Sequence, residues 1–214
     1  MAKGADPSAL TDDVRPLAQS EKSVRKREAI LRAAIEIINA RGFAAATMTD
    51  IAAALDLKDA ALYYYFPNKQ ALAYAGHQRS LERFEALLLR VDADGGTGLC
   101  KLRRFLRALL DDAVDNGPQL YFGDNSYLDP DQRLAIETWA ARLSKRLERF
   151  LEEGMADGSL APCEPELVVQ LILGMLIWLT KWAPGTPGLT NERLLGAIES
   201  MALNGLAGPR AGRE

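Results

Sequence analysis

The sequence predicts an all-α protein of about nine helices, in which a small N-terminal helical unit precedes a larger helical body. Apolar residues recur three and four positions apart in most segments, which is the spacing of a helix with one buried face. Clusters of glycine, proline and asparagine divide the chain into segments of helical length, and no segment alternates as a strand would. Because 48% of the residues are hydrophobic, the chain has ample side chains for a core.

The N-terminal unit is expected to hold three helices, at 23–40, 47–55 and 59–66, after a disordered tail at 1–20. Gly42 is expected to end the first helix in a left-handed conformation, Thr47 to cap the second, and Asn68 to cap the long fourth helix. The aromatic stretch 119–128 is expected to be irregular. The helices of the body are expected at 68–91, 99–116, 129 to between 154 and 158, 164–182 and 191–206.

Charge is divided unevenly along the chain. Residues 22–69 contain eight Lys and Arg against five Asp and Glu, a net charge of +3, whereas the whole chain carries −3. The rest of the chain therefore carries −6. A basic head on an acidic body is typical of a protein whose head alone meets a polyanion such as DNA.

Composition disfavours several other classes of protein. Cys100 and Cys163 make no disulfide framework in a chain of this length, and the single histidine, His77, excludes a His-rich metal site. The N-terminus shows no signal-peptide pattern. The apolar run 167–179 is short for a membrane span, so we expect it to form a buried helix. We expect a cytoplasmic protein without metal, cofactor or membrane contact.

Two short helices joined by a tight turn at Asp56 and Leu57 predict a helix-turn-helix, so residues 21–68 are interpreted as a DNA-binding domain. The second helix of such a unit enters the major groove, where small residues let the backbone approach the bases. Ala60 and Ala61 have this character, and the hydroxyl groups of the tyrosines that follow suit phosphates. Two lysines at helix starts, where the macrodipole disfavours a cation, also predict nearby phosphates; they are Lys58 and Lys69.

These residues resemble a known family. The pattern Thr47-x-Thr49-x-Ile51-Ala52, then Leu57, then Ala61-Leu62-Tyr63-Tyr64-Tyr65-Phe66-Pro67-Asn68-Lys69-x-x-Leu72 is similar to that of the TetR (tetracycline-repressor-like) family. The resemblance covers about 50 residues, and its core is a rather specific motif at this distance from the N-terminus.

The resemblance implies a role for each matching position. Phosphate contacts are expected from Thr47 and Thr49, base contacts from Lys58, Asp59, Ala60, Ala61 and Tyr64, and backbone contacts from Tyr63, Tyr65 and Lys69. Two positions depart from the family pattern. Asp56 replaces the usual glycine of the turn and must adopt a left-handed conformation at some cost. Lys58 replaces the usual capping residue, so Asp59 is the alternative cap.

The body, residues 69–208, is expected to form the dimer and to bind a small molecule. The resemblance implies that the last two helices pair with their copies as a homodimer, and both helices carry more apolar residues than one buried face requires. An apolar cavity is expected between the long fourth helix and the helices that follow. Its candidate lining residues, for each of which plain core packing is the alternative, are Phe84, Leu88, Phe105, Leu109, Tyr121, Phe122, Tyr127, Trp139, Met175, Trp178 and Trp182.

The chemistry of the effector is only outlined by the sequence. Aromatic and aliphatic candidates favour a largely apolar ligand, with Arg103, Arg107 or Asn125 as polar contacts. The segment 172–179, together with Trp182 and Pro184, is similar to that of family members that sense acyl-CoA or other lipid-derived compounds. The resemblance implies a repressor that leaves a palindromic operator when the ligand changes the spacing of the two heads.

Two rival functions predict different features. An enzyme would need paired carboxylates or a nucleophile with a base, but Asp111-Asp112 and Glu152-Glu153 are adjacent in sequence and cannot share a helix face. We therefore do not expect an enzyme. An architectural DNA-binding protein without a small-molecule ligand would have a solidly packed body, and a cavity in the body would count against it.

Overall fold

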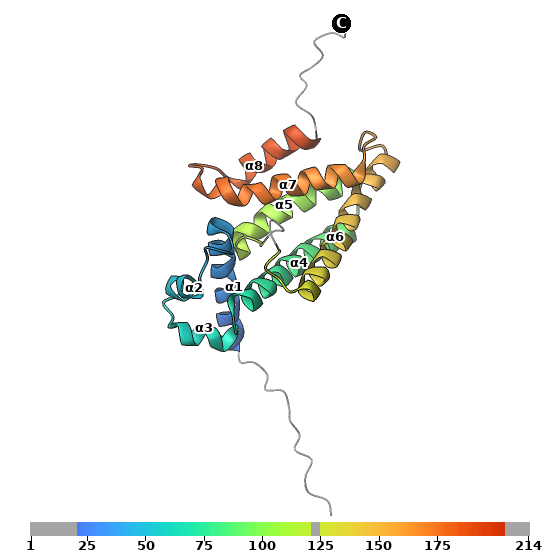
Figure 1. Cartoon of the computed structure of the whole chain (residues 1–214). Helices are drawn as coiled ribbons and strands as arrows, with labels where there is room; N and C mark the ends of the chain where they lie inside the picture. Colours follow the sequence, from blue (N-terminus) through green and yellow to red (C-terminus); the bar gives the residue numbers. More distant parts are fainter. Residues whose placement is uncertain (1–20, 121–124, 204–214) are drawn as a thin grey trace, which may run out of the picture.

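The computed structural model describes residues 21–120 and 125–203, and these residues contain helices and no strand (Figure 1). The tail predicted at 1–20 lies outside the described residues. The helices are α1 (Glu21–Arg41), α2 (Met48–Ala54), α3 (Asp59–Tyr65), α4 (Lys69–Ala93), α5 (Gly98–Asn116), α6 (Pro130–Ala156), α7 (Pro165–Trp182) and α8 (Asn191–Ile198). Eight α-helices are thus described, and a 3₁₀ turn (Ala183–Gly185) and a π-helical turn (Glu199–Leu203) extend α7 and α8.

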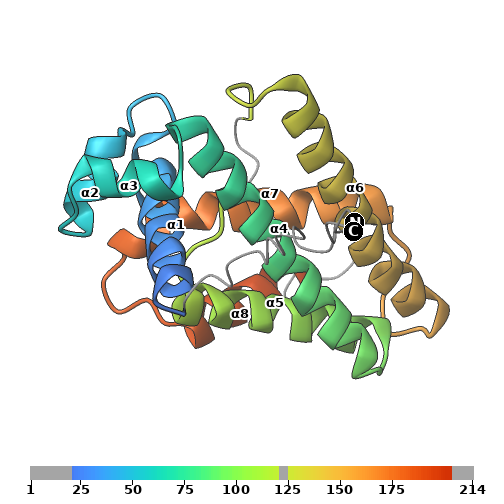
Figure 2. The ribbon, with the colours of Figure 1, turned by 90° about the horizontal axis from the view of Figure 1, so that it is seen from below.

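Helices α1, α2 and α3 form a head at one end of the molecule, drawn in blue to cyan (Figures 1 and 2). Its core is small and closely packed: Ile30 of α1, Ile51 of α2 and Leu62 of α3 are fully buried. Leu72, in the first turn of α4, joins the same cluster. The helix that starts the body is therefore anchored in the core of the head.

The body is built around α4, α5 and α6, which pack against one another, and α7 packs on α6 (Figure 2). Apolar residues at helical spacing on α5, such as Leu102, Phe105 and Leu106, are completely buried in its core. Helix α4 runs from the head into this core without a break, as the sequence predicts. A change in the body can therefore reach the head along one continuous element.

The ends of the N-terminal helices have the predicted residues and conformations. Gly42 follows α1 with a φ of 81°, and Thr47 caps α2 through its side chain. Asn68 caps α4 by accepting a 2.7 Å hydrogen bond from the Ala71 amide. The predicted last helix, in contrast, is α-helical only as far as Ile198 and then widens into the π-helical turn.

Helix α7 is not the buried helix that we expected from its composition. One side of it is buried, but Leu167, Leu171, Trp178 and Trp182 are 53%, 66%, 64% and 40% exposed. Among the described residues α7 is the one helix long and apolar enough to cross a membrane. Length and composition alone are weak evidence for a membrane span. Its exposed side chains lie on one stripe, since they follow one another four or seven positions apart, with Gly174 between Leu171 and Trp178.

Candidate DNA-binding surface and effector cavity

The start of α2 is held by a reciprocal cap between Thr47 and Asp50. The Thr47 hydroxyl accepts a hydrogen bond from the Asp50 amide at 3.0 Å and donates one to the Asp50 carboxylate at 2.6 Å. The same carboxylate accepts from the Thr47 amide, and the hydrogen bonds from Thr47 hold the pKa of Asp50 below its ordinary value. Thr47 and Thr49 are both exposed at this helix end, where a phosphate could approach.

The turn between α2 and α3 contains Asp56 with a φ of 52°, so this aspartate does take the left-handed conformation required of it. Lys58, not Asp59, is the N-cap residue of α3, and its side chain makes no capping hydrogen bond. The alternative in which Asp59 caps the helix is therefore wrong. The Asp59 carboxylate instead accepts a 2.7 Å hydrogen bond from the Thr49 hydroxyl and links the two helices.

Helix α3 presents an exposed face to solvent. Lys58, Asp59 and Ala60 are exposed and Ala61 is half-buried. Tyr63 is 50% exposed and Tyr64 is 81% exposed, whereas Tyr65 is half-buried against the core of the head and meets the Tyr64 ring edge-on at 5.1 Å between centroids. A large tyrosine left this exposed in a packed domain is characteristic of a contact surface.

Lys69 lies at the start of α4, as predicted, but its ammonium group already has partners. It donates hydrogen bonds to the carbonyl oxygens of Phe43 and Ala46 at 2.7 and 2.8 Å, and it lies 4.3 Å from the centre of the Phe43 ring. These hydrogen bonds give partners to main-chain carbonyl groups in the turn between α1 and α2. A phosphate contact by Lys69 stays a prediction, since this lysine has a structural function in the chain without DNA.

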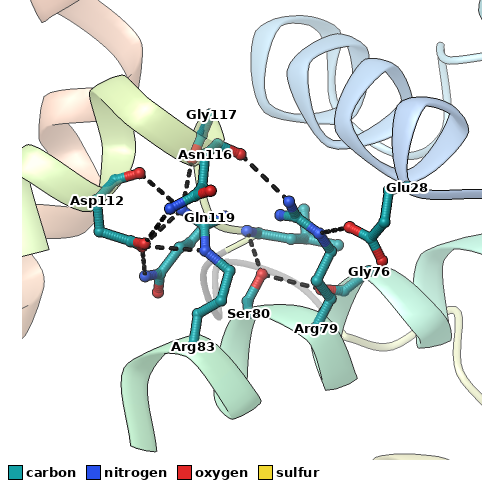
Figure 3. A network of polar contacts seen from close by, with 10 residues as sticks. Glu28, Gly76, Arg79, Ser80, Arg83, Asp112, Asn116, Gly117 and Gln119 are labelled. Carbon is teal, nitrogen blue, oxygen red and sulfur yellow. Dashed lines mark hydrogen bonds and ion pairs between the residues drawn. The ribbon is translucent and has the colours of Figure 1, made fainter. Parts of the chain in front are cut away.

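The head is joined to the body by a polar network around the C-terminal end of α5 (Figure 3). Arg83 of α4 forms a largely buried ion pair with Asp112 at 2.6 Å and donates to the Gly117 carbonyl at 2.8 Å. Arg79, one turn earlier, pairs with Glu28 of α1 at 2.6 Å. The two arginines thus bind α4 to α5 and to the head at adjacent points.

A second junction lies between the head and the residues that precede α6. The Tyr127 ring stacks on the Phe43 ring with centroids 3.6 Å apart, and its hydroxyl lies 2.9 Å from Nε2 of the buried His77. Burial lowers the pKa of His77 to about 4, so this imidazole is neutral near pH 7. Tyr127 therefore contacts the head and α4 at once.

A cavity of about 350 Å³ lies between α4, α6, α7 and the connection from α5 to α6. Its walls are mostly apolar, with Leu81 and Phe84 from α4 and Leu173 and Ile177 from α7. Polar groups from different elements converge on it: Ser80, Gln119, Asn125, Glu137, Ser144 and Gln170. A cavity of this size with a few polar groups can hold a small molecule.

A second cavity, of about 530 Å³, lies between α1, α5, α7 and α8. It is also largely apolar, and three of its lining residues, Glu36, Asn39 and Ala40, belong to the head. Gln119 lines both cavities and is only 2% exposed. The backbone around Gln119 therefore separates the two spaces.

The predicted lining residues are only partly brought together. Phe84 lines the first cavity and Leu109 the second, whereas Leu88 and Phe105 are buried in the solid core. Trp139 donates a hydrogen bond to Glu85, and Met175 packs against the core. Trp178 and Trp182 point outward on the exposed side of α7. Tyr121 and Phe122 lie outside the described residues.

Among the predicted polar contacts only Asn125 lines either of these two cavities. Arg107 pairs with Glu192 at 2.6 Å, and Arg103 lies 3.9 Å from Glu199, so both arginines face α8 instead. Sequence reasoning missed Ser80, Gln119, Ser144 and Gln170, because isolated polar residues in apolar patterns give no periodic signal. The described residues contain no cluster of three His, Cys, Asp or Glu that could hold a metal ion.

A head with two short helices joined by a tight turn, followed by an all-helical body, defines a helix-turn-helix DNA-binding protein. A family model described as "Bacterial regulatory proteins, tetR family" matches residues 30–75, and one described as "Tetracyclin repressor-like, C-terminal domain" matches residues 95–206. The chain belongs to the TetR family of transcriptional regulators.

Individual relatives agree with this assignment. The HTH-type transcriptional regulator YhgD of Bacillus subtilis is 23% identical over 198 residues, which are 86% of this chain and 98% of the relative. The crystal structure of PfmR from Thermus thermophilus is 27% identical, with a TM-score of 0.66, over 84% of this chain and 96% of its own. AibR in complex with isovaleryl coenzyme A and operator DNA is 26% identical, with a TM-score of 0.67, over 81% and 95%.

Proposed function

We propose that this TetR-family regulator is a repressor that binds a palindromic operator as a homodimer and leaves it when a largely apolar small molecule occupies its body. TetR regulators in general bind operator DNA, act as dimers and are cytoplasmic. The observation that carries the proposal is the combination of an exposed α3 face with a cavity bordered by α4, the helix that enters the body from the head.

The exposed face of α3 supports a direct contact with the major groove. We assign base contacts to Lys58, Ala60 and Tyr64 and backbone contacts to Thr47 and Tyr63, because these residues are exposed on the head. Asp59 and Thr49 already bind one another. Their predicted DNA contacts therefore require that this hydrogen bond opens or that Asp59 accepts from a cytosine amino group as well.

The outward side of α7 and the adjacent α8 supports the dimer. Leu171 and Trp178 are about two-thirds exposed on α7, and Met201, just after α8, is 49% exposed. An apolar stripe of this kind on a water-exposed helix is stabilised when a partner covers it. A second copy of the chain is the partner proposed, in agreement with the dimers of the family.

The cavity of about 350 Å³ supports a small-molecule effector and counts against a purely architectural DNA-binding protein. Its apolar walls favour a hydrocarbon group, and its hydroxyl and amide side chains, such as Ser80, Ser144 and Gln170, favour a carbonyl or hydroxyl group on the same molecule. An acyl thioester or another lipid-derived compound has this chemistry, and AibR binds isovaleryl coenzyme A. Movement of α4 on binding would change the distance between the two heads, which must match major grooves about 34–36 Å apart.

A selection of genomic DNA fragments by the purified protein, read by sequencing, tests the proposal. We expect enrichment of a pseudo-palindrome with half-sites one helical turn apart, and a Tyr64→Ala variant that loses discrimination between this site and random DNA. Enrichment of no sequence by a folded dimer would contradict the proposed operator binding. An equal loss of affinity for both DNAs in Tyr64→Ala would make Tyr64 a backbone contact.

A further inference from the structure

The connection from α5 to α6 touches the first cavity on one side and the head on the other. Gln119 lines the cavity, and its main-chain carbonyl accepts a 2.9 Å hydrogen bond from the Asn39 side chain in the last turn of α1. The Gln119 amide group donates to the Asp112 carboxylate at 3.2 Å (Figure 3). The next residue, Leu120, also lines the cavity and donates through its amide to the Ser80 hydroxyl at 2.7 Å.

These hydrogen bonds leave the backbone at Gln119 little freedom to move alone. Gln119 and Ser80 are both buried, so a hydrogen bond broken here would leave polar groups without water. A ligand that pushes the Gln119 side chain out of the cavity must therefore shift the main chain as well. That shift displaces the carbonyl oxygen to which Asn39 is bound.

Helix α7 also contacts Asn39. Leu173, Gly174 and Ile177 line the cavity, and Lys181, one turn after Ile177, donates a hydrogen bond to the Asn39 carbonyl oxygen. Asn39 is thus held through its side chain by one cavity-lining segment and through its main chain by another. Three residues further on, Gly42 ends α1 and the chain turns toward α2.

We propose that Asn39, through its side chain, is the positioning residue by which occupancy of the 350 Å³ cavity changes the orientation of the DNA-binding head. This inference rests on the proposed function and identifies the contact that connects the cavity to the head. Both contacts of Asn39 originate in elements that border the cavity, and both meet the helix that supports α2. The ion pair between Arg79 and Glu28 also joins the body to α1, but neither of its residues lines the cavity.

A side chain that fills the cavity can take the place of the unidentified effector. Ala140 of α6 is half-buried and lines the cavity, so Ala140→Trp directs an indole ring into it. Ala135, on the same helix, is exposed and lies outside this cavity, so Ala135→Trp is the matched control. The affinity of each variant for the selected operator is measured with Asn39, with Asn39→Ala and with Glu28→Gln, as double-mutant cycles.

We expect Ala140→Trp to weaken operator binding at least tenfold when Asn39 is present and less than threefold in the Asn39→Ala background. The tenfold effect should persist in Glu28→Gln, and Ala135→Trp should change affinity less than twofold in every background. Thermal melts report whether each variant is folded. If Ala140→Trp is not folded, Ser144→Trp replaces it, since Ser144 lines the same cavity.

An equal loss of affinity with and without Asn39 would overturn the inference, because the signal would then reach the head by another route. Loss of the effect in Glu28→Gln alone would assign that route to the ion pair with Arg79. A folded Ala140→Trp protein with unchanged operator affinity would also overturn it. Failure of the unmodified protein to bind any operator is a different result, since it contradicts the proposed function itself.

Discussion

Lys69 lies in the first turn of α4, and carbonyl oxygens of the turn after α1 stabilise its charge there. A cation in the first turn of a helix is disfavoured by the macrodipole, so a compensating partner is required. The sequence suggested a phosphate, whereas the structure supplies carbonyl oxygens of the turn that follows α1. The turn residues lie more than twenty positions earlier in the chain, so no local sequence pattern predicts that they lie beside Lys69.

Lys58 is the cleaner candidate for a phosphate or base contact, because it is exposed and no hydrogen bond or ion pair holds it among the described residues. We expect Lys58→Ala to reduce the slope of log affinity against log salt concentration by about one unit, as loss of one counterion-releasing contact requires. Titrations of operator DNA at several salt concentrations measure the slope. Lys145→Ala, in the body, is the control, and an unchanged slope in Lys58→Ala would remove Lys58 from the interface.

His77 is expected to make stability depend on pH. Burial lowers its pKa in the folded chain to about 4, against 6.5 as the ordinary value, so the unfolded chain binds the proton more readily. Stability is therefore complete above about pH 6.5 and falls as the pH decreases toward 4. At pH 5 the free energy of unfolding should be about 2 kcal/mol lower than at pH 7.5.

Urea denaturation at the two pH values measures this difference, and His77→Gln is the control. Because His77 is the only histidine of the chain, no other imidazole contributes to the change. The variant should be less stable than the parent at pH 7.5 but should show a much smaller decrease at pH 5. An equal decrease in both proteins would assign the effect to carboxyl groups instead.

At the scale of elements, the crossing of α5 and α6 depends on a glycine. A Cβ atom added to Gly98 would lie 2.1 Å from the Gly154 nitrogen and 2.2 Å from the Phe150 carbonyl oxygen. The Asp157 carboxylate accepts from the Gly98 amide at 2.8 Å, and hydrogen bonds from Ser159 and Gly98 lower the pKa of Asp157. Asp157, which follows α6, thus binds the first amide of α5, and the backbones of the two helices are in direct contact there.

Gly98→Ala should therefore separate the two helices and lower the free energy of unfolding by about 3 kcal/mol or more, as overpacking against backbone does. Ala113→Gly, at an exposed position of the same helix, should cost only about 1 kcal/mol through helix propensity. Denaturant titration of the two variants compares these effects. A Gly98→Ala protein as stable as the parent would show that the crossing can open without loss.

At the scale of the whole molecule, the outward stripe of α7 is expected to decide whether the two heads act together. Leu171→Asp places a charge in the proposed interface and should raise the dimer dissociation constant at least 100-fold, with a similar loss of operator affinity. Sedimentation analysis and operator titration measure both quantities. Leu134→Asp is the matched control, since Leu134 is 64% exposed on α6. A Leu171→Asp protein that remains dimeric would show that the dimer interface does not include this stripe of α7.

The extent of successful prediction differs between the head and the body. Short-range signals such as Gly42, Thr47 and Asn68 determine helix ends, and the structure confirms each of them. The cavity was predicted in the right region, but its lining was only partly identified. Helical periodicity cannot tell which turns of a helix face a space and which face a neighbour, so Leu88 and Phe105 proved to be solid core.

The sequence by itself determined the all-α class, the helix-turn-helix, the family and most helix boundaries, because these depend on residues within a few positions of one another. Only the tertiary structure decided that Lys69 supports the turn after α1, that the tryptophans of α7 point outward, and that Gln119 lies between the cavity and Asn39. Each of these facts depends on how helices distant in sequence pack together. That packing is set by the shapes of whole surfaces and by the need to pair buried polar groups, which no short stretch of sequence contains.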